Sequence, residues 1–262
     1  MVMHMQNIQF YKPSFDSIKK VLNDSKIYFQ DTNAKPINFN KSIEFKNVSF
    51  FYKNQNKKIF DNVNLRIDKG DRVGIKGSNG SGKTTILNLI SGLIKETSGS
   101  ISIDGYHNPY QNRNIWSKNI SYVQQNVFLL NTTIKNNIIL DEINFDNKKF
   151  EKLSSLLDLN NFFKNLSYGI NSDVGSDGIL LSGGQKQIIS IARALYRDSD
   201  VIIFDEPSSA LDESKSNNLL EIIKKLSADK TVIMVTHDLN SFRSCFNKIF
   251  SIENGSFSFE NI

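Results

Sequence analysis

The sequence predicts an α/β fold with a mostly parallel sheet, because short apolar runs alternate with segments of helical period. Residues 201–204 and 231–236 are almost entirely apolar, as buried parallel strands are. A third short run, residues 72–75, leads into a glycine-rich loop. All three runs are followed by polar or charged residues. We therefore expect three central strands that deliver functional side chains to one edge of the sheet, where ligands bind in open α/β sheets.

The other elements follow from hydrophobic periodicity. Alternating or short apolar stretches predict strands over residues 43–52, 64–67, 100–103 and 120–124. The third of these strands, followed by Asp104-Gly105, is typical of a hairpin arm. Apolar residues at three- and four-residue steps predict helices over residues 85–90, 147–166, 185–197 and 211–226. The segment 147–166 falls between predicted strands, so we expect a helical insert between two parts of the sheet.

Residues 77–84 fit the phosphate-binding pattern, in which two glycines with four residues between them precede a lysine and a hydroxyl residue. The three glycines of this loop let successive backbone N–H groups point at phosphate oxygens. Lys83 can reach the β- and γ-phosphates, and the Thr84 hydroxyl can ligate Mg²⁺. The strand before the loop and the helix after it favour nucleotide binding over a chance glycine-rich turn.

Two strand ends carry the candidate catalytic groups. Asp205 and Glu206 close a buried strand, and packing explains such adjacent charges poorly because burying a charge is costly. Asp205 is suited to hold Mg²⁺, directly or through water, and Glu206 to polarise the attacking water. His237 follows the next buried strand; a lone histidine is more often structural, but this placement favours a role at the site. Trp116 has no such support, and we interpret it as a packing residue.

The composition is that of a globular chain with a hydrophobic core. The 262 residues, 39% of them hydrophobic, suit one large domain or two small ones. No apolar run has the length of a membrane span, so any span must come from another segment or chain. The single cysteine, Cys245, excludes an internal disulfide and is compatible with the cytosol. The net charge of +5 is spread along the chain, so we expect no nucleic-acid partner, whereas an anionic membrane surface would suit it.

Residues 1–40 lack strand alternation and differ from the rest of the chain. A short helical pattern follows Pro13, and the stretch 31–40 around Pro36 is typical of a linker. These residues form either a frayed tail with one packed helix or a connector from a partner domain. In either case we expect the nucleotide-binding domain over residues 41–262, with a helical subdomain over about 126–197.

With these motifs in order, residues 43–259 resemble the nucleotide-binding domain of ATP-binding cassette (ABC) transporters. The Leu-Ser-Gly-Gly-Gln sequence at residues 181–185 is the signature of that family, and it precedes Asp205 by 20 residues (205 − 185), as in family members. The resemblance implies a P-loop NTPase core with a mostly parallel sheet, an N-terminal antiparallel β subdomain and an inserted α-helical subdomain. It also implies that residues 1–40 connect to a membrane domain.

The resemblance assigns roles residue by residue. Tyr52 matches the aromatic residue that stacks on adenine, Gln125 the glutamine that senses Mg²⁺ and faces the membrane domain, and His237 the histidine that contacts the γ-phosphate. The expected catalytic residues are Glu206, His237 and Gln125, and the expected Mg²⁺ ligands are Thr84, Gln125 and Asp205. The expected ATP-binding residues are Tyr52, Gly77, Ser78, Asn79, Gly80, Ser81, Gly82, Lys83, Thr84, Thr85, Ser182, Gly183, Gly184 and Gln185.

In this family two such domains pair head to tail, as a homo- or heterodimer. Each ATP then lies between residues 77–84 of one domain and 182–185 of the other, which explains a second anion-attracting helix N-terminus in each chain. Residues 128–134 and 172–178 resemble the exporter subgroup, above all flippases of lipid-linked oligosaccharides and then peptide exporters. The chain departs from the usual exporter pattern, without loss of a catalytic group, at Ser176, Ile188, Pro207 and Asp238.

The resemblance thus implies an ATPase that uses ATP and Mg²⁺ at the cytoplasmic face of the plasma membrane. It would power export or flipping of a substrate through a separate transmembrane domain. One alternative is a soluble ATPase of the same superfamily, bound to ribosomes or DNA, but those chains usually carry two cassettes or a long coiled coil. Another is a non-catalytic module that binds ATP as a switch, which the intact Lys83, Asp205, Glu206 and His237 disfavour.

Overall fold

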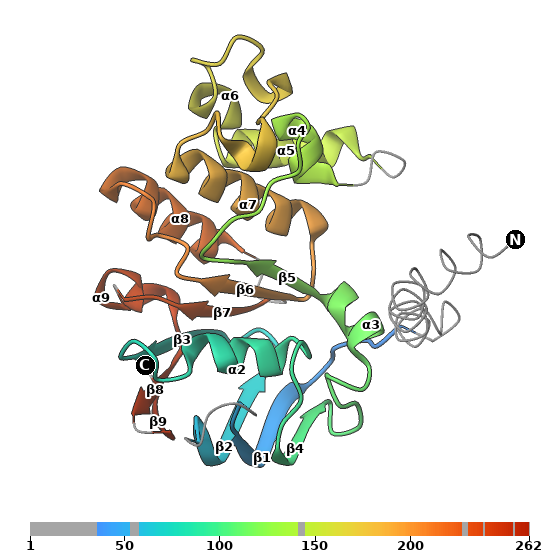
Figure 1. Cartoon of the computed structure of the whole chain (residues 1–262), viewed down its shortest axis with the longest axis vertical. Coiled ribbons are helices and arrows are strands. Elements are labelled where there is room, and N and C mark those ends of the chain that lie inside the picture. The colour runs from blue at the N-terminus through green and yellow to red at the C-terminus, as the bar shows by residue number, and fades with distance from the viewer. Residues whose placement is uncertain are drawn as a thin grey trace, which may run out of the picture. The chain divides into compact units, whose positions relative to one another are not determined.

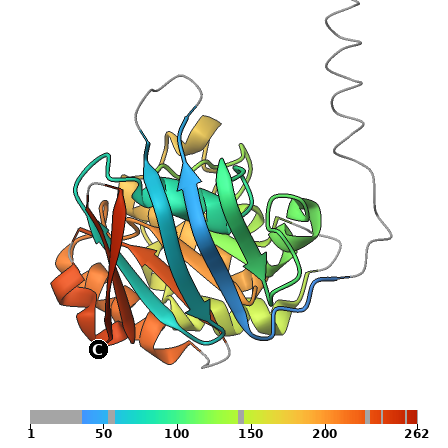
Figure 2. The ribbon, with the colours of Figure 1, turned by 90° about the horizontal axis from the view of Figure 1, so that it is seen from below.

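The computed structural model describes residues 36–52, 58–140, 145–226, 230–237, 239–253 and 255–261. The helical pattern expected after Pro13 therefore lies outside the described residues, as does Asp238. The strands are β1 (Ser42–Phe50), β2 (Phe60–Asp68), β3 (Arg72–Gly77), β4 (Ser98–Ile103), β5 (Ile120–Val123), β6 (Val201–Asp205), β7 (Thr231–Val235), β8 (Lys248–Glu253) and β9 (Ser256–Asn261). They form a three-stranded sheet of order β2-β1-β4 and a six-stranded sheet of order β5-β6-β7-β3-β8-β9 (Figures 1 and 2).

The six-stranded sheet is parallel except for its last pair. β5, β6, β7, β3 and β8 pair in parallel, and β9 pairs antiparallel with β8. Every residue of β6 and β7 is buried, which follows from their apolar sequences. The α/β class with a mostly parallel sheet is thus confirmed. β7 lies between β6 and β3, so the three strands predicted to carry functional residues are neighbours.

The three-stranded sheet is antiparallel, with β1 at its centre. Ile43 pairs with Ile67 on one side and with Ile103 on the other, and these three side chains are fully buried. The predicted hairpin arm at residues 100–103 is strand β4, but its partner is β1 and not an adjacent strand. The carboxylate of Asp104 explains this pairing, because it accepts hydrogen bonds from the backbone N–H groups of residues 40–42 at the start of β1.

The helices are α2 (Lys83–Ile90), α3 (Arg113–Trp116), α4 (Ile134–Ile139), α5 (Asn147–Leu156), α6 (Leu159–Phe162), α7 (Gly183–Arg197), α8 (Glu213–Lys225) and α9 (Leu239–Phe242). α2 lies between the two sheets (Figure 2), and its apolar side chains belong to one core with both of them. α4 to α7 lie beyond the β5 edge (Figure 1) and form a second core with α8. The single helix expected over 147–166 breaks at Asp158, which has φ 48°.

The compact unit begins at Ile37, four residues before the boundary expected at Lys41. Ile37 and Phe39 are buried, and the Phe39 ring meets the Trp116 ring edge-on with centroids 5.8 Å apart. The side-chain amide of Asn119 donates to the Ile37 carbonyl (2.7 Å). Trp116 is fully buried and its indole N–H donates to the last carbonyl of α2 (2.9 Å), so its interpretation as a packing residue is confirmed. Residues 37 and 39 are only two apolar positions, which is too few to form a periodic pattern that would predict their burial.

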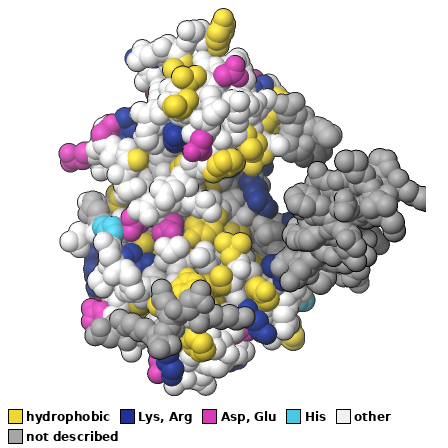
Figure 3. Space-filling model, viewed as in Figure 1, with side chains coloured by type: hydrophobic (Ala, Val, Ile, Leu, Met, Phe, Trp, Pro, Cys, Tyr) yellow, Lys and Arg dark blue, Asp and Glu magenta, His cyan; other side chains and the backbone are white. Residues whose placement is uncertain are grey.

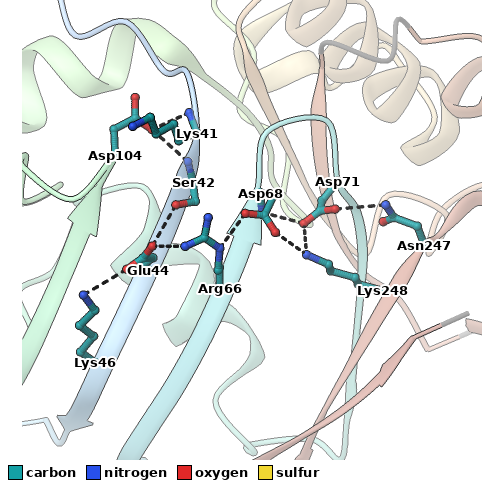
Figure 4. A network of polar contacts seen from close by, with 10 residues as sticks. All are labelled: Lys41, Ser42, Glu44, Lys46, Arg66, Asp68, Asp71, Asp104, Asn247 and Lys248. Carbon is teal, nitrogen blue, oxygen red and sulfur yellow. Dashed lines mark hydrogen bonds and ion pairs between the residues drawn. The ribbon is translucent and has the colours of Figure 1, made fainter.

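A network of ion pairs ties the two sheets together (Figure 4). Lys248 of β8 contacts Asp68 at the end of β2 (2.9 Å) and Asp71 in the turn before β3 (2.6 Å). Asp68 also accepts a hydrogen bond from Arg66 (2.7 Å), which pairs with Glu44 of β1. The network therefore crosses from the antiparallel sheet to the parallel sheet at the β2–β3 turn, and it fixes the first strand of the candidate site.

The surface carries charged side chains of both signs. On the face shown in Figure 3, Lys and Arg side chains alternate with Asp and Glu side chains, and apolar side chains gather between them. Among the described residues, no helix is both long enough and apolar enough to cross a bilayer.

Candidate functional site

The carboxyl ends of β3, β6 and β7 meet at one edge of the parallel sheet. Val235 of β7 is paired with Ile75 of β3 and with Asp205 of β6, so β6 and β7 end level with each other and β3 continues to Gly77. A cleft of about 530 Å³ opens at this edge. The phosphate loop lines it together with Tyr52, Gln125, Glu206 and His237. The structure thus brings together predicted residues from five separate parts of the sequence, whereas those at 182–185 do not line the cleft.

The phosphate loop has the form of an anion cradle. It joins β3 to α2, and the ammonium of Lys83 is tucked into it, donating to the carbonyls of Gly77 (2.9 Å) and Ser78 (3.1 Å). The hydroxyl of Ser81 is buried and has no hydrogen-bond partner among the described residues. A side-chain carbon added at Gly80 would meet nothing within 4 Å, so the loop is open on that side. An unsatisfied donor, a lysine and the N-terminus of α2 together suit a phosphate group.

Gly82 shows why this loop requires glycine. Its φ is 106°, a conformation that L side chains rarely adopt. A Cβ at this position would lie 2.7–2.8 Å from side-chain atoms of Ile59 and Phe60. The close contacts come from Phe60, the first residue of β2, and from Ile59 just before it, so the start of β2 packs directly against the phosphate loop.

The carboxylate of Asp205 accepts two hydrogen bonds on one oxygen. The Thr84 hydroxyl (3.2 Å) and the Tyr122 hydroxyl (3.3 Å) both point to its Oδ2 atom. Asp205 is 6% exposed, and this burial, with the Glu206 charge, raises its pKa against the opposing effect of the Thr84 and Tyr122 hydrogen bonds. Burial and the Asp205 charge likewise raise the pKa of Tyr122. The predicted Mg²⁺ ligands Thr84 and Asp205 are thus in contact.

Glu206 is held between two side chains from different loops. Its Oε2 accepts a hydrogen bond from the Gln125 amide (2.7 Å), and its Oε1 lies 2.7 Å from Nε2 of His237. The backbone of Glu206 has φ 52°, in the left-handed region, and its N–H donates to the Val235 carbonyl (2.9 Å). The three residues predicted to be catalytic therefore form one cluster at the mouth of the cleft.

Tyr52 lies at the other side of the cleft, after the end of β1. Its hydroxyl is 3.2 Å from the Thr85 hydroxyl, and its ring meets Phe50 edge-on with centroids 4.9 Å apart. The residue is 38% exposed, so a ring of fixed orientation is open to a planar partner.

The segment 182–185 lies elsewhere in the chain. Ser182 caps α7 by accepting from the Gln185 N–H (3.3 Å), while the Gln185 side chain accepts from the Ser182 N–H (2.9 Å). The two glycines that follow pack on Ala210, because a Cβ at Gly184 would lie 3.1 Å from the Ala210 carbonyl. Within the described residues, none of 182–185 lines the cleft that contains the phosphate loop.

Tyr122 is the site residue that sequence reasoning missed. The stretch 120–124 was predicted as a strand, which β5 confirms, but no role was assigned to its side chains. The available signal was its position: in a strand that pairs with the Asp205 strand, Tyr122 stands opposite Ile203 and close to the strand's carboxyl end.

Comparison with known proteins agrees with this geometry. The family model described as "ABC transporter" matches residues 60–209. The chain is 40% identical over 247 residues to the multidrug resistance-like ATP-binding protein MdlA of Buchnera aphidicola (subsp. Baizongia pistaciae), covering 93% of this chain and 42% of MdlA. It is 37% identical over 216 residues to the alpha-hemolysin translocation ATP-binding protein HlyB of Escherichia coli O157:H7, covering 82% of this chain and 30% of HlyB. The structure of a bacterial Atm1-family ABC exporter with ATP bound matches with TM-score 0.79 and 26% identity, over 93% of this chain and 44% of that one.

The chain belongs to the ABC transporter family. The family resemblance inferred from the signature and the phosphate loop is confirmed, and with it an ATPase domain that binds nucleotide. HlyB is named as a translocation protein and the solved structure as that of an exporter, which favours a transport-coupled ATPase over a soluble one. The chain spans less than half the length of each relative named above.

Proposed function

We propose that this domain binds and hydrolyses ATP to power export or flipping of a substrate across a membrane. It would act through a transmembrane domain, at the cytoplasmic face of the plasma membrane, either as a peripheral subunit or as part of a membrane complex. The observation that carries the proposal is that the phosphate loop and the Gln125–Glu206–His237 cluster line one cleft, with Asp205 in contact with Thr84 of that cleft. The likeness to the translocation protein HlyB and to the Atm1-family exporter supports the coupling to transport. The likeness to flippases of lipid-linked oligosaccharides stays a prediction.

The phosphate loop and Tyr52 would hold the nucleotide. Backbone N–H groups of the loop and the buried Ser81 hydroxyl would donate to phosphate oxygens, since that hydroxyl has no partner among the described residues. Lys83 would exchange its carbonyl acceptors for the β- and γ-phosphates, a stronger charge-assisted contact. Tyr52, fixed by Phe50 and Thr85, would stack on the adenine.

Thr84, Asp205 and Gln125 fit Mg²⁺ by the chemistry of their donors, because a hydroxyl, a carboxylate and an amide oxygen are hard ligands. The described residues hold no cluster of three or more His, Cys, Asp or Glu side chains suited to a metal ion, so the remaining ligands would come from phosphate and water. When bound, Mg²⁺ supplies charge neutralisation for phosphoryl transfer.

Glu206 would act as the general base. Its carboxylate is close to the nucleotide cleft and would accept a proton from the attacking water. Gln125 would orient this carboxylate through its hydrogen bond to Oε2, and the imidazole of His237 would contact the γ-phosphate. Preorganised donors of this kind supply most of the catalysis of phosphoryl transfer.

A second domain would complete the site. Ser182, Gly183, Gly184 and Gln185 form the N-terminus of a 15-residue helix that lies outside the cleft of their own chain. A helix N-terminus with two glycines suits an anion. We infer that these residues face the γ-phosphate bound by a partner domain in a head-to-tail homo- or heterodimer, with two-fold symmetry or pseudosymmetry.

The test is ATP turnover by the purified chain with Mg²⁺, compared with Glu206→Gln. This variant keeps the shape of the side chain and removes its charge, so kcat should fall by about 10²- to 10⁴-fold while ATP affinity stays within about twofold. Glu213→Gln, at an exposed carboxylate of α8, is the matched control and should turn over normally. Wild-type turnover by Glu206→Gln would refute the assignment of the base.

A second test measures the binding of ATP directly. Lys83→Ala should weaken ATP binding by at least about 1.5–3 kcal/mol, the usual worth of a hydrogen bond to a charged group. Titration of a fluorescent ATP analogue measures this loss, with Lys118→Ala, a change at an exposed lysine, as the comparison. Unchanged affinity in Lys83→Ala would contradict the nucleotide site itself.

A further inference from the structure

The hydroxyl of Tyr122 donates to Asp205, one of the proposed Mg²⁺ ligands, at the same oxygen that the Thr84 hydroxyl contacts. Asp205 Oδ2 accepts from Thr84, which belongs to the loop and helix α2, and from Tyr122, which belongs to β5. No other hydrogen bond to the Asp205 carboxylate is found among the described residues. Two donors on one oxygen restrict rotation of the carboxylate about its last torsion angle, which otherwise has broad freedom.

The position of Tyr122 is set by rigid elements. β5 pairs in parallel with β6, and Tyr122 stands opposite Ile203, close to the end of the strand that carries Asp205. Its side chain packs against the core that contains Trp116 and the apolar side chains of α2. Its hydroxyl is therefore held at the carboxylate by the sheet and not by a mobile loop.

We propose that Tyr122 is a positioning residue for Mg²⁺, which acts by holding the Asp205 carboxylate in the orientation that binds the ion next to Thr84. The inference rests on the proposed function, because it assumes that Asp205 and Thr84 hold Mg²⁺. Hydrogen-bond partners of metal ligands typically change metal affinity by about 10- to 100-fold when they are removed. Loss of the Tyr122 hydroxyl should therefore weaken Mg²⁺ binding and leave metal-free nucleotide binding intact.

The experiment compares Tyr122→Phe with Tyr196→Phe. Both variants lose a phenol hydroxyl, but the Tyr122 hydroxyl donates to Asp205 (3.3 Å), whereas the Tyr196 hydroxyl accepts from the Asp146 N–H (2.9 Å). Fluorescent ATP-analogue affinity is measured in EDTA and then during Mg²⁺ titration, in a Glu206→Gln background that prevents turnover. Tyr122→Phe should raise the half-saturating Mg²⁺ concentration about 10- to 100-fold with unchanged affinity in EDTA, while Tyr196→Phe matches the parent.

Turnover provides a second readout. In the otherwise wild-type chain, Tyr122→Phe should need more Mg²⁺ for half-maximal rate and should recover most of kcat at saturating Mg²⁺. A general loss of structure would instead lower kcat at all Mg²⁺ concentrations and weaken binding in EDTA, which would overturn the inference. If Tyr122→Phe is unstable, Tyr122→Met repeats the test with a side chain that fills similar space without a hydroxyl.

Asp205→Asn separates the failure of this inference from that of the proposed function. If Asp205→Asn keeps the parent's Mg²⁺ dependence, Asp205 is not a Mg²⁺ ligand and the proposed site fails. If Asp205→Asn loses Mg²⁺ dependence while Tyr122→Phe behaves like the parent and like Tyr196→Phe, the proposed site stands and the role of Tyr122 is refuted.

Discussion

The imidazole of His237 and the carboxylate of Glu206 lie 2.7 Å apart, at the ends of the neighbouring parallel strands β7 and β6. Because Gln125 bonds the other oxygen of the same carboxylate, both oxygens of Glu206 have a partner. His237 is the more exposed of the two, with a side chain 55% exposed against 14% for Glu206. The histidine is thus the member of the pair with more freedom to turn toward a phosphate.

Replacing His237 by alanine should slow hydrolysis more than it weakens binding. Loss of one preorganised donor to a developing charge typically costs about 10²- to 10³-fold in kcat, whereas the phosphate loop retains the ground-state contacts. Steady-state kinetics with Mg²⁺ and ATP measure both parameters. His107→Ala, at an exposed turn after β4, is the control. If kcat of His237→Ala equals that of the wild type, the contact with Glu206 has a structural role only.

Glu206→Gln should form an ATP-dependent dimer. Without hydrolysis, each γ-phosphate would stay bridged between the phosphate loop of one chain and residues 182–185 of the other; ADP lacks that group and should leave monomers. Adding Ser182→Arg should block dimer formation and leave ATP binding by the monomer intact, whereas Ser167→Arg, at an exposed serine in the same region, should not. Size-exclusion chromatography with ATP or ADP measures this. A monomer at saturating ATP would contradict head-to-tail pairing of the isolated chain.

Residues 37–40 should contribute to stability although they precede β1. Phe39 is 1% exposed, and truncation of such a ring to alanine typically costs about 3–5 kcal/mol of unfolding free energy. Asn38→Ala changes an exposed neighbour and should be nearly neutral. Urea unfolding of Phe39→Ala, Asn38→Ala and the wild type measures the difference. A chain that starts at Lys41 should be less stable than one that starts at Ile37, and equal stability would show that the contact with Trp116 is dispensable.

The ion-pair network between the sheets should make stability depend on acid pH. The hydrogen bond from Lys46 lowers the pKa of Glu44 below its ordinary 4.5. Burial opposes the same shift at Asp68, but hydrogen bonds from Lys248 and Arg66 outweigh it and lower the pKa below 3.8. The pKa of each of these carboxyl groups is therefore lower in the folded protein than in the unfolded protein. Each carboxylate stabilises the fold at pH values above its unfolded pKa, and this contribution is lost as the pH falls through its folded pKa.

The unfolding free energy should therefore fall as pH drops below about 4.5, and less steeply in Glu44→Gln and Asp68→Asn than in the wild type. Chemical unfolding at a series of pH values between neutral and acid measures the slopes. Glu253→Gln, at an exposed carboxyl outside this network, is the control and should follow the wild type. Identical slopes in all four proteins would show that the network does not contribute to the pH dependence.

The central strands could be predicted because their apolar composition indicates that they are buried. β6 and β7 are buried throughout and apolar except at Asp205 and Thr231, and the phosphate loop has a fixed pattern of residue types. Strand β2 was predicted to start at Asn64 but starts at Phe60. Asn62 has φ 50° and the pairing with β1 shifts between Val48 and Phe50, so the alternation that marks a strand is interrupted.

Other features depend on contacts distant in sequence, which periodicity does not reveal. β9 is an edge strand that is largely exposed, and α4 has only six residues, started by the Thr133 side chain. The contact of Tyr122 with Asp205 joins two strands that are far apart in the chain. The position of residues 182–185 outside the cleft could not be predicted either, because the signature motif alone does not say whether its ligand is bound by the same chain or by a partner.

The tight fit of Gly82 against Ile59 and Phe60 has a consequence for chimeric proteins. Replacing β2 and its neighbouring strands with those of a relative would also replace the side chains at positions 59 and 60, against which the phosphate loop packs. A crossover between β2 and β3 would take residues 59 and 60 from one parent and the phosphate loop from the other, even though the sequence at 77–84 stayed whole. Chimeric domains should therefore take residues 59–84 from a single parent. Chimeras in which this segment is divided between two parents should lose nucleotide affinity before they lose their fold.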